Sequence, residues 1–278
     1  MSLFMWPVEP KLGKDTMKLA LTNPVQRWPT SVLSGENSFD LRLPKMRPVP
    51  RLICRSFLKL YGSQVIAVEG AEHISAGCDP FILALNHSQK REAILIPAIL
   101  AALREGRQVH FMADWNFLMI PIVGFIIRCN EPIIVDRKSA RPRLLNVLKP
   151  WLTSRVSVLD QARQRIREGR SIGIFPEATV NRDPHRLLRG LNGAAQLSLE
   201  LGVPVIPAGV RFPEQPPGTP IRESARFSIH FGQPLRPSAR EQLSIMAVRG
   251  WHAEIMTAIA RLSGKEWFPD NRRIKYAI

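Results

Sequence analysis

The sequence reads Phe81-Ile-Leu-Ala-Leu-Asn-His-Ser-Gln-Lys-Arg-Glu92 at the point that decides the fold. Its first five residues are an uncharged apolar run, which is typical of a strand that is buried on both faces. Polar residues then end the run, and a second apolar segment of helical length extends from Glu92 to Leu103. A buried strand that leads through a short loop into a helix is the building unit of a parallel sheet, because parallel neighbours need a crossover connection.

The same alternation of strand and helix continues along the chain. Strands are expected at Gln64–Val68, Phe81–Leu85, Val109–Met112, Ile133–Val135, Ser171–Phe175, Val205–Val210 and Arg226–Phe231. Helices are expected at Glu92–Leu103, Ser157–Glu168, Gly193–Leu201 and Glu241–Leu262. We therefore predict an α/β fold with a largely parallel central sheet flanked by helices. Residues 46–278 should form this domain, and residues 1–45, which mix Pro, Ser, Asn and charge without periodicity, a loosely ordered arm.

Composition restricts the classes of partner. The 278 residues include 45% hydrophobic and 22% charged residues, as in a folded domain, and 39 Lys plus Arg against 23 Asp plus Glu give a net charge of +16. Such a surface attracts phospholipid headgroups, nucleic acid or an acidic carrier protein. A nucleic-acid partner is not expected, because only 7% of residues are aromatic and no zinc spacing occurs. The three cysteines, Cys54, Cys78 and Cys129, suggest neither a disulfide framework nor a metal site and favour a reducing compartment.

Two segments have the pattern of membrane-surface elements. Arg47, Arg51, Arg55 and Lys59 recur every fourth residue, with apolar residues on much of the other side, which predicts an N-terminal basic amphipathic helix. A helix that packs on the core with a solvated face would fit the same pattern equally well. The apolar run Phe117–Ile127 is too short to span a bilayer. It is expected to be a buried core segment, with an interfacial placement as the alternative.

Two strand ends carry the residues of a candidate catalytic site. His87 ends the first, and Glu92 follows one helical entry turn later, where a carboxylate can fix the tautomer of an imidazole that acts as a general base. The second strand, from Ser171, stops at Pro176 and is followed by Glu177, Thr179 and Arg182. Loops beyond the carboxyl ends of parallel strands converge, so these groups should lie together, at the mouth of an apolar pocket.

In this order the blocks resemble those of the glycerolipid acyltransferases, the family of 1-acylglycerol-3-phosphate and lysophospholipid acyltransferases. The blocks are Asn86-His87 with Glu92, Ile133-Ile-Val-Asp-Arg137, Phe175-Pro-Glu-Ala-Thr179 and Val203-Pro-Val-Ile-Pro207. The resemblance implies transfer of a fatty acyl group from acyl-CoA or acyl-carrier protein to the hydroxyl of a lyso-lipid, without a cofactor or metal. It also implies a peripheral or monotopic protein that binds the anionic surface at the cytoplasmic face of a membrane.

The resemblance assigns catalysis to His87 and Glu92, and substrate binding to Arg137, Glu177, Thr179 and Arg182. The chain departs from the family pattern at three places. Glu92 stands where an aspartate is usual, Val180 where an arginine is usual, and Leu191 where a lysine is usual. The Val180-Asn181 pair is instead similar to the third block of tafazzin-like lysophospholipid acyltransferases. Because two cations of a phosphate pocket are lost, a catalytically inactive lipid-binding relative is the alternative.

The pattern Gly169-Arg-Ser-Ile-Gly173 satisfies the serine-hydrolase motif Gly-x-Ser-x-Gly. A nucleophile elbow needs a strand before the serine and a helix after it. Here Gly169 is expected to end a helix and Ser171 to begin a strand. A serine-hydrolase site is therefore not predicted.

Overall fold

The computed structural model describes residues 41–270 apart from 141, 155, 217 and 239–242. The strands are β1 Val65–Glu69, β2 Ile82–Leu85, β3 His110–Asp114, β4 Ile133–Val135, β5 Ile172–Ile174, β6 Val205–Arg211 and β7 Phe227–Phe231. The α-helices are α1 Pro48–Tyr61, α2 Glu92–Leu103, α3 Pro121–Cys129, α4 Lys149–Leu152, α5 Val158–Arg167, α6 Gly193–Leu201 and α7 Ile245–Ser263. Short 3₁₀ segments include η6 Trp115–Met119 and η7 Arg143–Leu148.

The strands form one seven-stranded sheet in the order β1-β7-β6-β2-β5-β3-β4. Strands β6, β2, β5, β3 and β4 run parallel to one another, whereas β7 is antiparallel to β6 and parallel to β1. The prediction of a largely parallel sheet is confirmed. Strand β2 lies at the centre, between β5 and β6, which explains why all four of its residues are buried.

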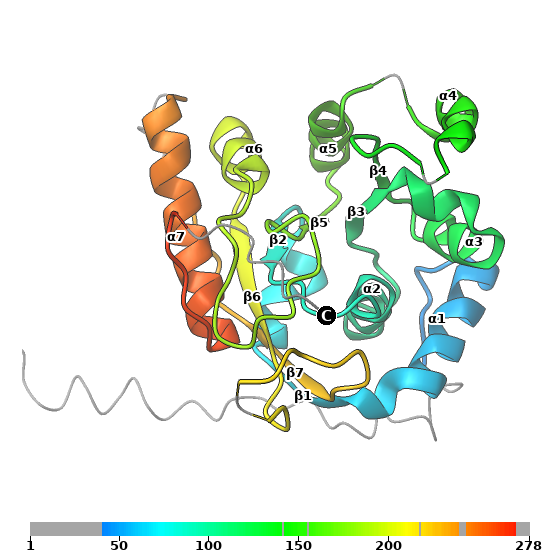
Figure 1. Cartoon of the computed structure of the whole chain (residues 1–278), viewed down its shortest axis with the longest axis horizontal. Helices are drawn as coiled ribbons and strands as arrows, with labels where there is room; N and C mark the ends of the chain where they lie inside the picture. Colours follow the sequence, from blue (N-terminus) through cyan, green and yellow to red (C-terminus); the bar gives the residue numbers. More distant parts are fainter. Residues whose placement is uncertain (1–40, 141, 155, 217, 239–242, 271–278) are drawn as a thin grey trace, which may run out of the picture.

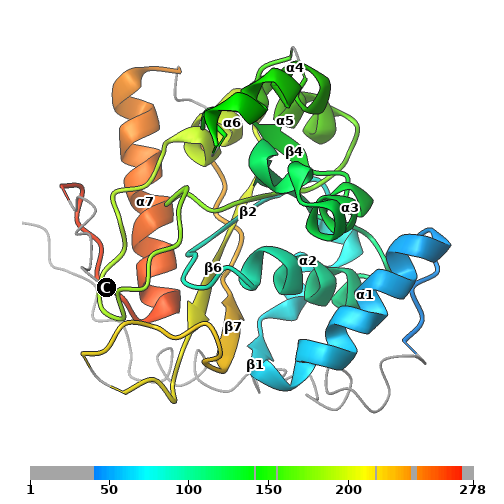
Figure 2. The same ribbon diagram turned by 45° about the vertical axis from the view of Figure 1, so that its right-hand side comes forward.

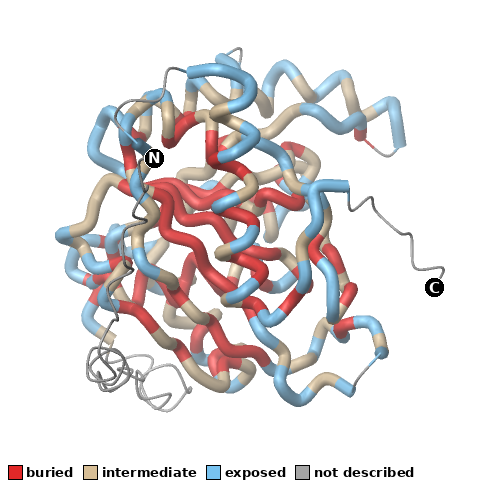
Figure 3. The backbone as a smooth tube through the Cα atoms, turned by 90° about the vertical axis from the view of Figure 1, so that its left-hand side faces the viewer, coloured by how far each residue is buried: buried red, intermediate tan, exposed pale blue. Residues whose placement is uncertain are grey.

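Helices cover both faces of the sheet (Figure 1, Figure 2). On one face, Leu83 and Leu85 of β2 join a core with α1 and α2; on the other, Ile82 and Ala84 join a core with α5, α6 and α7. The alternation of side chains along β2 thus feeds two cores. Figure 3 shows the buried strands between these layers.

Local signals place several helix ends. Ser157 accepts a hydrogen bond from the backbone N–H of Asp160 and caps α5, and Gly202, in a left-handed conformation at φ 66°, ends α6. The predicted C-terminal helix starts later than expected. Glu241 lies outside the described residues, and Ser244 caps α7, which begins at Ile245.

The predicted amphipathic helix is α1, and it packs on the core, which is the second of the two expectations. Its buried residues are Cys54 and Leu58, which face α2. Arg51 and Arg55 are only partly exposed, because their guanidinium groups donate hydrogen bonds to the carbonyls of Met46 and Leu41. The two arginines therefore hold the preceding segment against the helix.

The expectation of a buried core segment at Phe117–Ile127 is wrong for much of its length. The run forms η6 and α3, and Phe117, Ile120, Ile122 and Phe125 are exposed. Among the described residues, α3 packs on η6 and α1, which leaves these side chains uncovered. Within the described part of the chain, no helix has both the length and the apolar character needed to cross a bilayer.

Of the arm predicted over residues 1–45, residues 1–40 lie outside the described residues. Leu43 is buried in the core beside α1 and α2. The packed part of the chain therefore includes residues just before the predicted boundary.

Candidate active site

The candidate site lies where β2 and β5 end side by side. The two strands pair in parallel, with Ile82 opposite Ile172 and Ala84 opposite Ile174. His87 therefore follows the end of β2 at the same edge of the sheet where Glu177 follows the end of β5. Parallel pairing brings together two segments that are 90 residues apart in the sequence.

The contact expected between His87 and Glu92 is present. Nδ1 of His87 lies 2.9 Å from Oε2 of Glu92, and the same oxygen accepts a hydrogen bond of 2.8 Å from the backbone N–H of Ser88. A carboxylate can only accept, so the proton of the neutral imidazole belongs on Nδ1 and Nε2 is left with its lone pair. Glu92 is fully buried at the first position of α2, where the helix dipole favours a negative charge.

Glu177 holds the His87 loop by its backbone. It accepts hydrogen bonds from the N–H of His87 at 3.2 Å, from the N–H of Leu188 at 2.9 Å and from the side-chain amide of Asn181 at 2.6 Å. In return, the N–H of Asn181 donates to the carbonyl of His87 at 2.7 Å. Burial raises the pKa of Glu177, and these hydrogen bonds oppose the rise. Glu177 therefore contacts the backbone of the His87 loop and of Leu188, together with the side chain of Asn181.

Aromatic packing fixes the plane of the His87 ring. The ring stacks on Phe175, with centroids 4.2 Å apart and an interplanar angle of 27°, and Phe175 packs in turn on Phe111. Gly173 of β5 makes room for this column, since a Cβ there would lie 2.5 Å from the Phe111 ring. The imidazole is therefore held on one face by an apolar wall.

The other predicted substrate-binding residues, Arg137, Thr179 and Arg182, are not held against His87 as Glu92 and Glu177 are. Arg182 pairs with Glu223 at 2.5 Å, and Glu223 also accepts a hydrogen bond from the N–H of Lys90. Arg137 is exposed just after β4, and Thr179 is half-buried in the loop after β5. Arg182 shares the loop that holds the His87 backbone, whereas Arg137 follows a strand at the edge of the sheet.

Sequence reasoning missed two residues that hold the site together. Asn86 is buried and joins β2 to β6, because its side chain donates to the carbonyl of Val210 and accepts from the Val210 N–H. Its place next to His87 in the first block was the available signal. Lys265 is also buried, and its Nζ donates to Oγ of Ser88. No local pattern indicates Lys265, which is 177 residues from its partner.

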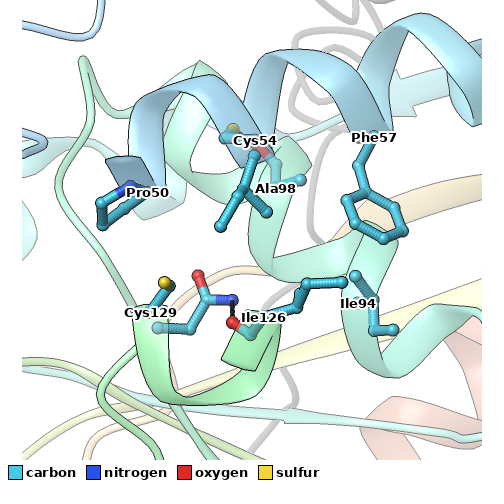
Figure 4. A pocket seen from close by; sticks show the side chains of 9 residues that line it. Pro50, Cys54, Phe57, Ile94, Ala98, Ile126 and Cys129 are labelled. Atoms are coloured by element: carbon cyan, nitrogen blue, oxygen red, sulfur yellow. Dashed lines mark hydrogen bonds between the residues drawn. The ribbon is translucent and has the colours of Figure 1, made fainter. Parts of the chain in front are cut away.

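An apolar pocket lies between α1, α2 and α3 (Figure 4). Cys54 and Phe57 of α1, Ala98 of α2 and Ile126 of α3 point into it, and burial raises the pKa of the Cys54 thiol to about 12. Ile94, two residues after Glu92 on α2, also lines it. The lining of this pocket does not include His87. The expectation that His87 and Glu92, the dyad of the site, lie at the mouth of an apolar pocket is therefore not met by it. Among the described residues no cluster of His, Cys, Asp or Glu has the form of a metal site.

A protein-family model for acyltransferases matches residues 65–211, which is more than half of the chain and includes both His87 and Glu177. The chain belongs to the acyltransferase family. Within that family it resembles the glycerolipid enzymes. Chloroplastic 1-acyl-sn-glycerol-3-phosphate acyltransferases of Arabidopsis thaliana and Brassica napus are 25% and 24% identical to it over 150 residues. These alignments cover 54% of this chain but only 37% and 38% of the two plant proteins.

The acyltransferase fold is also found in a solved structure. The crystal structure of the 1-acyl-sn-glycerophosphate acyltransferase from Thermotoga maritima matches with a TM-score of 0.50 and 20% identity. The match covers 78% of this chain and 79% of the other. The shared fold extends beyond the residues that the family model matches.

Proposed function

We propose that the protein transfers a fatty acyl group from an acyl thioester, acyl-CoA or acyl-carrier protein, to the hydroxyl of a lyso-lipid such as 1-acylglycerol-3-phosphate or a lysophospholipid. The observation that carries the proposal is the contact between His87 and the fully buried Glu92. It leaves Nε2 of His87 as a free base at the end of a rigid central strand. Family membership supplies the reaction class, and the plant relatives suggest the kind of acceptor.

In the proposed reaction, the hydroxyl oxygen of the lyso-lipid attacks the carbonyl carbon of the thioester while Nε2 of His87 removes the hydroxyl proton. The carbonyl oxygen becomes negatively charged in a tetrahedral intermediate. The carbon–sulfur bond then breaks, the carbonyl re-forms, and the proton passes from Nε2 to the leaving thiolate. Glu92 stabilises the imidazolium that exists between the two proton transfers. No covalent acyl-enzyme intermediate forms in this sequence of steps.

We propose that four residues take part in acceptor binding: Arg137, Glu177, Thr179 and Arg182. Glu177 shapes the loop through its three hydrogen bonds. A phosphate at Arg182 would compete with Glu223, which already pairs with that guanidinium. This competition favours an acceptor whose headgroup is not held by Arg182 alone.

The test is thioester-dependent acylation by the purified protein, followed by mass spectrometry of the lipid product. His87→Gln should lower kcat by about 10²- to 10⁴-fold, the usual contribution of a general base. His185→Gln is the matched control, because it makes the same change at an exposed histidine. Equal rates for the wild-type protein and His87→Gln would overturn the assignment of the base.

The inactive lipid-binding relative is the second candidate. It is favoured by the pairing of Arg182 with Glu223 and by the loss of cations at Val180 and Leu191. If the wild-type protein binds vesicles but acylates none of a broad panel of lyso-lipids, this second candidate replaces the first.

We further propose that the protein acts at the cytoplasmic face of a membrane, as a peripheral or monotopic protein bound to an anionic surface. The support is an apolar surface on η6, α3, η7 and α4. Segment η6 packs on α3 and α4, and η7 packs on α4, while α4 lies above α3 in Figures 1 and 2. We call it the α3–α4 surface, and its exposed residues are Phe117, Ile120, Ile122, Phe125, Leu144, Val147, Leu148 and Trp151. Trp151 is 87% exposed, and tryptophan favours the membrane–water interface. Arg143 and Lys149 lie beside these residues in the chain and suit anionic headgroups; Lys149 also pairs with Asp136.

Sedimentation with vesicles tests this surface. Ile122→Ser should weaken binding to vesicles that contain phosphatidylglycerol, and Trp151→Ser should do the same. Ile245→Ser is the control, since Ile245 is 73% exposed, close to the 76% of Ile122, and lies on α7 at the opposite side of the molecule in Figure 1. Unchanged binding of a combined Ile122→Ser and Trp151→Ser variant would reject the α3–α4 surface.

A further inference from the structure

Lys265 is a buried cation that the proposed reaction does not yet use. It follows Gly264, which ends α7, and is 7% exposed. Its Nζ donates hydrogen bonds to Oγ of Ser88 at 3.0 Å and to the carbonyl of Asp183 at 2.7 Å. Lys265 therefore contacts both the loop after β2 and the loop after β5.

The backbone next to Lys265 keeps it in this position. The N–H of Lys265 donates to the carbonyl of Ala260 in α7, and the N–H of Glu266 donates to the carbonyl of His185. The N–H of Leu187 donates back to the carbonyl of Glu266. The lysine is thus anchored on α7 and on the loop after β5, so its side chain reaches Ser88 from fixed backbone.

The charges of three buried carboxyl groups act on this ammonium group. Glu92, Glu177 and Asp183 are each less than a tenth exposed, and the charge of each acts on Lys265. Burial lowers the pKa of Lys265, and the attraction of these three carboxylates opposes that change. Burial of an ammonium is costly unless it is paired and hydrogen-bonded, so an apolar residue here would be the simpler choice for stability alone.

Ser88 connects Lys265 to the dyad. Its Oγ accepts from Lys265, and its backbone N–H donates to the Glu92 oxygen that also meets Nδ1 of His87. The other carboxylate oxygen of Glu92, Oε1, has no hydrogen-bond partner among the described residues. The negative charge of Glu92 is therefore stabilised by only these two hydrogen bonds among the described residues. The positive charge of Lys265 adds to that stabilisation.

We propose that Lys265 is a positioning residue of this site: its ammonium group joins the two catalytic loops and balances the buried charges of Glu92 and Glu177, so that His87 carries its proton on Nδ1. This inference rests on the proposed function for its kinetic consequence, but not for the tautomer that it assigns to His87. The hydrogen bonds of the Lys265 ammonium group go to Ser88 and Asp183 and not to the imidazole of His87. Lys265 acts through Ser88, Glu92 and Glu177.

The kinetic test compares Lys265→Met, which keeps the length and removes the charge, with Lys265→Arg, which keeps the charge. Without the ammonium group, the pKa of Glu177, already raised by burial, should rise further, because the positive charge of Lys265 lowers it in the wild-type protein. Lys265→Met should lower kcat by about tenfold or more with little change in KM. As the pH is lowered, kcat of this variant should begin to fall at a higher pH than kcat of the wild type. The titratable groups whose charge acts on Lys265 are Glu92, Glu177 and Asp183, and His87 lies beyond Ser88.

Lys265→Arg should recover much of the activity and the wild-type pH profile. Lys45→Met is the control for the substitution, since Lys45 is exposed and pairs only at the surface with Glu105. A Lys265→Met variant with the wild-type kcat and pH profile would refute the inference. So would a Lys265→Arg variant that is as impaired as Lys265→Met, because volume and not charge would then be the cause.

Nitrogen-15 NMR of the imidazoles gives a readout that needs no catalysis, with the His87→Gln variant used to assign His87. The wild-type signal should show the proton on Nδ1, and Lys265→Met should show a mixture of tautomers. If the wild-type protein acylates nothing, the proposed function fails and the NMR result still decides the role of Lys265. If Lys265→Met does not fold, Ser88→Ala removes the link and leaves the charge. An unchanged His87 tautomer and unchanged kcat in Ser88→Ala would overturn the proposal.

Discussion

Replacing Glu92 by glutamine removes the charge next to His87 and keeps the length of the side chain. In the structure one oxygen, Oε2, accepts both from Nδ1 of His87 and from the N–H of Ser88. The amide oxygen of a glutamine can occupy that place and accept the same two hydrogen bonds. The amide nitrogen then lies where Oε1 has no hydrogen-bond partner among the described residues. The variant therefore separates the charge of Glu92 from its geometry.

The size of the effect follows from the separation and the burial. Glu92 is fully buried and the His87 side chain is 13% exposed, so an effective dielectric constant of about 20 applies, and unit charges about 4 Å apart attract by about 4 kcal/mol. The attraction exists only while the imidazole is protonated, so its loss raises the barrier and not the ground state. Allowing for relaxation, about 2 to 4 kcal/mol corresponds to a loss of about 30- to 1,000-fold in kcat. The free energy of unfolding should also fall, because the buried amide nitrogen has no acceptor among the described residues and Lys265 loses one of the carboxylates whose charge acts on it.

The assay is steady-state acyl transfer with a thiol-trapping reagent that follows release of the thiol, combined with thermal unfolding of each variant. Glu92→Asp is the companion variant: it keeps the charge but withdraws the carboxylate by about 1.5 Å, one carbon–carbon bond, so the 2.9 Å contact breaks. It should lose activity as well. A Glu92→Gln variant with wild-type kcat would refute the role of the charge. A gain of activity in Glu92→Asp would refute the view that the site is built around glutamate.

Three further predictions follow from packing and burial. Asn86→Ala leaves the N–H and the carbonyl of Val210 buried without their partners, so the free energy of unfolding should fall by about 2 to 4 kcal/mol in urea titrations, at about 1 to 3 kcal/mol for each unpaired group; a loss under 0.5 kcal/mol would contradict this. Gly173→Ala forces a Cβ against the Phe111 ring and should cost about 1 to 3 kcal/mol and displace the ring that stacks on His87, seen as a loss of kcat; wild-type values for both would show that the column yields freely. Burial lowers the pKa of His110 from 6.5, so its contribution to stability is complete above pH 6.5 and is lost as the pH falls through the lowered value; His110→Gln should make unfolding less dependent on pH below 6.5, and an identical pH dependence would reject that origin.

Much of the fold could be predicted because its signals are local. Apolar runs such as Phe81–Leu85 are too continuous for a half-exposed strand, and caps such as Ser157 and Gly202 end helices by satisfying backbone groups that lie within a few residues. The meeting of His87 with Glu92 could also be predicted, since five residues separate them across one loop. That the Glu177 loop faces them followed from parallel pairing of β2 with β5.

The sequence by itself therefore determined the alternation of strands and helices, the sheet type and the pairing of His87 with Glu92, because each depends on neighbours along the chain. Only the tertiary structure decided which apolar residues stay exposed and which charges are buried. Ile122 lies in an apolar run that has the composition of a core segment, but no element among the described residues covers its side chain. Arg182 meets Glu223, and Lys265 reaches Ser88, through contacts between residues 41 and 177 positions apart. Burial and charge pairing depend on what the fold brings alongside a residue, and no window of sequence contains that information.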